Sequence, residues 1–139
     1  MRRNPVVKEV SDLLIPAIVL FGMYVQFHGD FGPGGGFQAG VIVAAGAILY
    51  ALVYGLERAQ RFIPPRAVQL LSAAGLLLYA GVGFATVLLG SEYLNYDALG
   101  ADKLGAQHLG ILLIEFGVGT TVASVMVSVF YAFAGRGRP

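Results

Sequence analysis

Apolar residues fill four long stretches of the chain, and short hydrophilic segments separate them. The stretches cover residues 13–27, 37–56, 67–90 and 109–135, and only Glu115 interrupts the last of them. A helix needs about 20 apolar residues to cross roughly 30 Å of hydrocarbon. The first stretch reaches that length if its helix extends back to about residue 7. The pattern predicts one all-α membrane domain over residues 1–139, a bundle of four transmembrane helices with spans at about 7–28, 37–56, 67–90 and 109–134.

Two features of the first stretch leave its structure open. Pro16 either lies inside a long helix and kinks it, or belongs to the first turn of a shorter helix, where proline costs little. The start of the chain, Met1-Arg2-Arg3, resembles the beginning of a signal peptide, but no small-residue cleavage site follows the apolar stretch. We therefore expect the segment to be retained as a signal anchor.

Composition supports lipid as the solvent of this chain. Hydrophobic residues make up 57% of the sequence and charged residues 12%, whereas a soluble domain carries about a quarter charged residues. A net charge of +1 gives no reason to expect nucleic acid as a partner. The chain has no cysteine, which excludes disulfides, thiolate-bound metal clusters and cysteine nucleophiles.

The basic residues cluster on one side of the predicted spans. They precede the first span, separate the second from the third, and follow the fourth, as Arg2, Arg3, Lys8, Arg58, Arg61, Arg66, Arg136 and Arg138. Lys103 alone falls on the other side, together with Asp30, Glu92, Asp97 and Asp102. Basic residues concentrate in cytoplasmic loops. We therefore expect a multi-pass protein of the cell membrane with both termini in the cytoplasm.

A glycine-rich segment joins the first two spans. Its members are Gly32, Pro33, Gly34, Gly35, Gly36 and, two residues further on, Gln38. Glycines adopt backbone angles that other residues avoid, so this connection is not expected to be ordinary helix. Irregular backbone near the membrane must be buried by protein or reached by water. The segment is therefore either part of an ion route or a tight hairpin that passes close to a neighbouring helix.

Glu115 is the single Asp, Glu, Lys or Arg residue within the four apolar stretches. It lies roughly 10 Å beyond Leu109, counted along a helix, and acidic residues at such depth usually face a bundle interior or a cavity. No Lys or Arg lies inside any of these stretches. If Glu115 is ionised, its counter-charge must come from sodium, a proton relay or another polypeptide. Alternatively, a protonated Glu115 joins two helices through a hydrogen bond.

Two histidines fall on the extracytoplasmic side. His28 ends the first span beside Asp30, and His108 opens the fourth, about two turns before Glu115. At this position the two histidines either collect protons or are ordinary residues of the membrane boundary. Axial haem ligands normally lie deeper and face each other across a bundle, so we expect neither a cofactor nor a metal site.

Small residues at helical spacing predict close helix packing. Gly119 and Ala123 lie on the same side of the fourth span as Glu115, since residues three or four apart share a face. Such residues allow neighbouring helices to approach closely. The packing candidates are Gly40, Ala44, Gly117, Gly119 and Ala123.

Two motifs give the chain a resemblance to a known family. The first is Phe27-His28-Gly29-Asp30 followed by Gly32-Pro33-Gly34-Gly35-Gly36-Phe37-Gln38, and the second is His108-Leu109-Gly110 followed by Glu115-Phe116-Gly117-Val118-Gly119-Thr120-Thr121-Val122. Both resemble segments of the MnhB/MrpB family, whose members are membrane components of the Mrp-type multisubunit sodium/proton antiporters. Gly32 stands where that family has serine, Ala39-Gly40 replaces a pair of glycines, and Thr120 replaces leucine.

The resemblance implies a membrane subunit of a complex of six or seven proteins that exchanges cytoplasmic sodium ions for external protons. Its partners would be the other Mrp subunits and membrane lipid. Among the residues above, we expect Glu115, His108, His28 and Asp30 to serve the ion pathway. The alternatives are a purely structural scaffold, which conducts nothing, and the equivalent subunit of an energy-converting hydrogenase-type complex.

Overall fold

The structure is a computed structural model, and it describes residues 4–29, 34–100 and 102–136. The helices are α1 Pro5–His28, α2 Gly36–Tyr54, α3 Leu56–Phe62, α4 Pro65–Leu88, the short 3₁₀ helix η1 Tyr96–Leu99, and α5 Lys103–Gly135. Within these described residues there is no strand. Four of the helices, α1, α2, α4 and α5, are long and apolar enough to cross a membrane. The expected all-α bundle of four transmembrane helices is confirmed.

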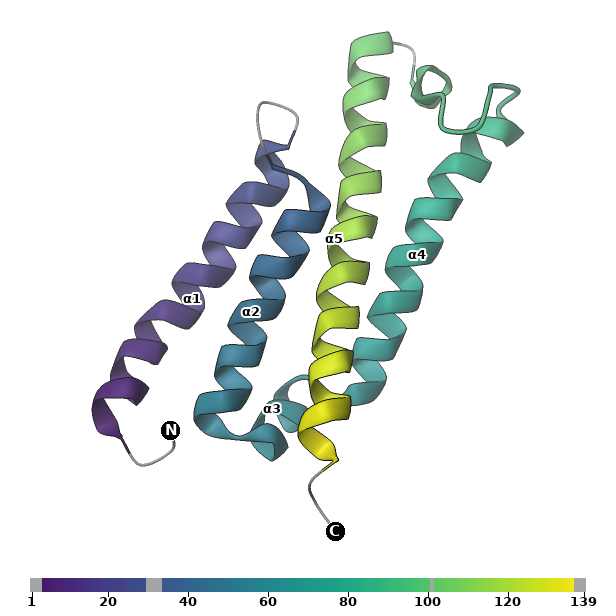
Figure 1. Ribbon diagram of the computed structural model, residues 1–139. Coiled ribbons are helices and arrows are strands. Elements are labelled where there is room, and N and C mark those ends of the chain that lie inside the picture. Colours follow the sequence, from purple (N-terminus) through teal and green to yellow (C-terminus); the bar gives the residue numbers. More distant parts are fainter. Residues whose placement is uncertain (1–3, 30–33, 101, 137–139) are drawn as a thin grey trace.

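The four long helices stand side by side in a layer, in the order α1, α2, α5, α4 (Figure 1). The last helix of the chain therefore lies in the middle, where it packs against α2 on one side and α4 on the other. The outer helices α1 and α4 are separated by this pair. The molecule consists of two helical hairpins, α1–α2 and α4–α5, that meet along the seam between α2 and α5.

α1 is continuous from Pro5 to His28, so Pro16 lies in the helix interior rather than in a first turn. The helix begins where it does because the Asn4 side chain accepts a hydrogen bond from the Val6 amide (3.0 Å) and Pro5 takes the first position. A helix start leaves backbone amides without intrahelical partners, and this side chain satisfies one of them. The structure thus decides between the two positions expected for Pro16.

The end of the layer where α1 begins and α5 ends holds the core and the short helix α3 (Figure 1). Gly55 joins α2 to α3 with φ of 98° and ψ of 151°, a conformation that favours glycine. Leu56 and Ala59 of α3 are buried against the long helices, and the Tyr131 hydroxyl donates to the Ile63 carbonyl (3.1 Å). The sequence analysis predicted no helix here, because a helix of seven residues is too short to produce a periodic pattern.

α5 is longer than its predicted span and extends beyond the α1–α2 hairpin (Figure 1). It starts at Lys103 because the Asp102 side chain accepts a hydrogen bond from the Gly105 amide (3.2 Å). Its 33 residues give a length of about 50 Å, more than the roughly 30 Å of bilayer hydrocarbon. The extra turns carry the connection to α4, where the ring of Tyr96 in η1 packs against Gly110.

Candidate functional site

The carboxyl group of Glu115 lies against the glycine-rich connection between α1 and α2. A Cβ atom built on Gly29 would lie 2.5 and 2.6 Å from the two carboxyl oxygens, and one built on Gly35 would lie 3.1 Å from Oε1. The first two distances are too short for a real side chain, and the third is tighter than an ordinary contact. The carboxyl group therefore occupies space that exists only because residues 29 and 35 are glycines.

The seat of this carboxyl group is formed by the ends of two helices. Gly29 follows the last residue of α1, and Gly35 directly precedes α2. The first amides of α2 have no partners within the helix, and Gly35 has no side chain with which to cap them. A helix N-terminus carries partial positive charge, and a C-terminus carries unpaired carbonyl groups and partial negative charge. The partial positive charge at the start of α2 favours an ionised carboxylate nearby, and the partial negative charge at the end of α1 favours its protonated form.

This geometry adds a source of counter-charge for Glu115 that the sequence analysis did not consider. Sequence reasoning required sodium, a proton relay or another polypeptide to balance an ionised Glu115. The N-terminus of α2, which belongs to the same chain, is a fourth candidate. The sequence analysis did not consider this helix end, because it counted only charged side chains and not the partial charges of the backbone.

The glycines of the hairpin hold α2 close to α5. A Cβ atom on Gly36 would collide with the backbone carbonyl oxygen of Glu115 and lie 2.8 Å from its carbonyl carbon. One turn further along, a Cβ on Gly40 would lie 2.6 Å from the Gly119 carbonyl oxygen. The connection itself is tight, since the Gly35 amide donates to the Val25 carbonyl (3.3 Å). The described residues of this connection therefore pack closely on α5.

The two histidines differ in their position relative to the Glu115 carboxyl group. His108 is exposed on α5 and precedes Glu115 by seven positions, a separation of about 10 Å along the helix. His28 is partly buried, stacks on the Tyr24 ring with centroids 5.1 Å apart, and directly precedes Gly29. Of the two, only His28 ends the helix against which the carboxyl lies.

The other predicted residues fall into three groups. Asp30, Gly32 and Pro33 lie outside the described residues. Gln38 is exposed, and Gly34 packs against the carbonyl of Val25. The packing candidates Gly40, Ala44, Gly117 and Gly119 are buried, while Ala123 is partly buried.

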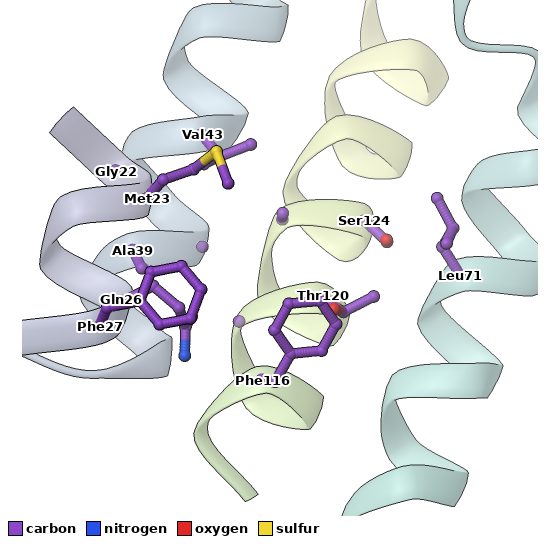
Figure 2. Close-up of a pocket in the computed structure, with 13 residues that line it drawn as sticks. Gly22, Met23, Gln26, Phe27, Ala39, Val43, Leu71, Phe116, Thr120 and Ser124 are labelled. Atoms are coloured by element: carbon purple, nitrogen blue, oxygen red, sulfur yellow. The ribbon is translucent and has the colours of Figure 1, made fainter. Parts of the chain in front are cut away.

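Gln26 is a residue that sequence reasoning missed. It is 8% exposed, and its Oε1 lies 2.5 Å from where a Cβ of Gly119 would be. It therefore occupies the seam between α1 and α5 one helical turn inward from the Glu115 seat. Figure 2 shows Gln26 at the edge of a cavity that is also lined by Phe116, Thr120 and Ser124 of α5. The available signal was an uncharged polar residue inside an apolar stretch, which a search for ionisable groups passes over.

The seat predicts a specific effect of Gly29→Ala. The backbone at Gly29 is right-handed helical (φ −56°, ψ −35°), so alanine fits the backbone, but its methyl group would take the place of the carboxyl oxygens. We expect transport by the assembled complex to fall several-fold while the melting temperature changes little. Gly81→Ala is the matched control, because nothing lies within 4 Å of a Cβ at that position. Equal transport by both variants would show that the carboxyl position is unimportant.

Comparison with known proteins agrees with the two motifs. Residues 6–128 match the family described as "Domain related to MnhB subunit of Na+/H+ antiporter". A Staphylococcus haemolyticus protein named "Putative antiporter subunit mnhB2" is 30% identical over 97% of this chain and 98% of its own length. A Staphylococcus aureus protein of the same name is 31% identical over the same shares of the two chains. The chain belongs to the MnhB family.

Proposed function

We propose that this chain is a membrane subunit of a multisubunit sodium/proton antiporter, in which it contributes Glu115 to the ion pathway. Family membership and the antiporter names of its relatives support the first part. The position of the Glu115 carboxyl between the ends of α1 and α2 is the observation that carries the second. The chain acts as one component of a transporter and has no enzymatic role in this proposal.

The seat suits a group that gains and loses a proton. A carboxylate needs donors and positive potential, which the start of α2 supplies. A protonated carboxyl needs an acceptor, and the last turn of a helix has carbonyl groups without intrahelical partners. Both helix ends belong to the hairpin that contacts Glu115, so partial charges of both signs lie near its carboxyl group. The same carboxylate can neutralise a sodium ion while the proton is absent.

The basic residues support an orientation with both termini in the cytoplasm. In the layer, Arg58 and Arg61 of α3 lie at the end where α1 begins and α5 ends (Figure 1). The opposite end holds acidic residues, including Glu92, Asp97 and Asp102. In this orientation the Glu115 seat lies toward the external side, from which protons would enter.

Removing the chain tests the proposed function as a whole. Everted membrane vesicles from cells that express every other subunit but lack this chain should show no sodium-dependent proton movement. A pH-sensitive dye reports that movement when sodium is added. Supplying the chain from a second plasmid should restore the signal. Undiminished exchange without the chain would contradict the proposal.

A further inference from the structure

One face of the helix layer is hollowed between α1 and α4, above the seam where α2 meets α5. A cavity of about 310 Å³ there is lined by all four long helices (Figure 2). A second cavity, of about 140 Å³, adjoins it. The residues that line both are Val43, Leu71, Ala123 and Ser124. Together the two cavities form one central groove that runs along α5 from Phe116 to Val127, about 16 Å at the rise of an α-helix.

The central groove is apolar and open at the surface. Large side chains at its edge are about half exposed, namely Met23 (51%), Phe27 (56%) and Phe116 (53%). Apolar cavities do not hold water stably. In a bilayer the groove must therefore be filled by something apolar, either a lipid chain or a helix of a protein.

Gln26 distinguishes between these two occupants. Its side chain is more than nine-tenths buried, and its Nε2 atom has no hydrogen-bond partner among the described residues. A buried amide donor without an acceptor destabilises the folded chain. The side chain lines the groove, and rotation about its several single bonds can turn Nε2 toward an occupant. A lipid acyl chain has no hydrogen-bond acceptor, whereas a helix can present a hydroxyl, carboxamide or carboxyl oxygen.

The groove also has the shape of a helix-packing site. Small residues such as Ala39, Gly40 and Ala123 line its floor, and small residues allow the backbones of transmembrane helices to approach closely. Thr120 and Ser124 lie on the same side of α5 and line the groove (Figure 2). Polar groups of this kind bond across helices inside membranes.

We propose that the central groove receives a transmembrane helix of another subunit of the antiporter complex, and that this helix presents an oxygen acceptor to Nε2 of Gln26. This inference rests on the proposed function for the existence of the complex, but not on any role of Glu115. It assigns to the groove a task separate from the Glu115 seat, which lies one turn further out on the same helices.

Site-specific cross-linking in the complete complex tests the inference. The native chain has no cysteine, so Ala123→Cys carries the only thiol of the subunit, and a maleimide–benzophenone reagent labels it before illumination. We expect an adduct whose mass is that of this chain plus one other subunit. Val125→Cys is the matched control, since Val125 lies on α5, is 45% exposed and is absent from the groove lining. It should give at least about ten-fold less of that adduct.

The other outcomes of the cross-linking experiment overturn the inference, and a second variant tests the hydrogen bond to Gln26. The intact mass of the protein confirms that residue 123 was labelled, so a labelled chain that forms only lipid adducts, or none, means that no helix occupies the groove. An adduct of two copies of this chain identifies a homodimer interface instead. Gln26→Leu, which keeps the size and loses the donor, should lower the recovery of the adduct several-fold, and unchanged recovery would remove the hydrogen bond from the proposal. Failure of cross-linking in a complex that still needs this chain for antiport would affect the groove alone.

Discussion

Replacing Glu115 with glutamine in the complete complex is expected to abolish sodium-dependent proton movement, with a loss of at least about ten-fold, or about 1.4 kcal/mol or more in the rate-determining free energy. Glutamine has nearly the same size and still fits the space left by Gly29 and Gly35. However, a carboxamide neither releases a proton nor balances the charge of a cation. Everted vesicles with a pH-sensitive dye measure the effect directly.

Controls separate this loss from a failure of assembly. The variant complex should be recovered with all of its subunits in unchanged proportion, because the packing around residue 115 is preserved. Glu9→Gln makes the same chemical change at an exposed position near the start of α1, and it should leave transport within about two-fold of the native level. If Glu115→Gln exchanges ions at the native rate, Glu115 has only a structural role and the chain acts as a scaffold.

Gly36→Ala is expected to have the second large effect, and it acts on the structure. The new methyl group would meet the carbonyl oxygen of Glu115 and lie 2.8 Å from its carbonyl carbon. Backbone atoms cannot rotate away as a side chain can, so α2 and α5 must separate. Overpacking of this kind costs about 1–3 kcal/mol and sometimes more. Thermal unfolding in detergent should show a melting temperature lower by several degrees, and transport should be lost with it.

Gly81→Ala is also the control for Gly36→Ala. Gly81→Ala also adds one methyl group to a glycine inside a long helix, but nothing lies within 4 Å of it. Alanine is a better helix former than glycine by about 1 kcal/mol, so Gly81→Ala should leave the melting temperature unchanged or raise it slightly. A Gly36→Ala variant as stable as Gly81→Ala would mean that α2 and α5 are not in close contact at this point.

Hydrophobic patterning was sufficient to predict the number and type of the long helices. An apolar stretch of about 20 residues has few alternatives to a transmembrane helix, and all four expected stretches became helices. The boundaries were less predictable. The start of α5 at Lys103 depends on a cap by Asp102, which lies outside the apolar stretch. The helix α3 was missed because it is held by burial of Leu56 and Ala59 rather than by its own pattern.

The candidate site was predictable only in part, because its geometry joins distant segments. Sequence reasoning selected Glu115 and the glycines, each for a separate reason. Nothing in one sequence indicates that α5 lies between α2 and α4, and it is this order that brings residue 115 to residues 29 and 35. For the same reason Gln26 could not be connected to Gly119. The roles of these residues in transport remain predictions that the experiments above will decide.

The central position of α5 has a consequence for how the protein is made. Synthesis proceeds from the N-terminus, so the first hairpin enters the lipid well before the final segment leaves the ribosome. Until then the gap left by Gly29 and Gly35 stays unfilled, and the acid that fills it has yet to emerge. An acidic side chain in hydrocarbon is costly, and docking beside α2 removes that cost. Burial of this one acidic side chain thus favours docking of the late helix between two earlier ones.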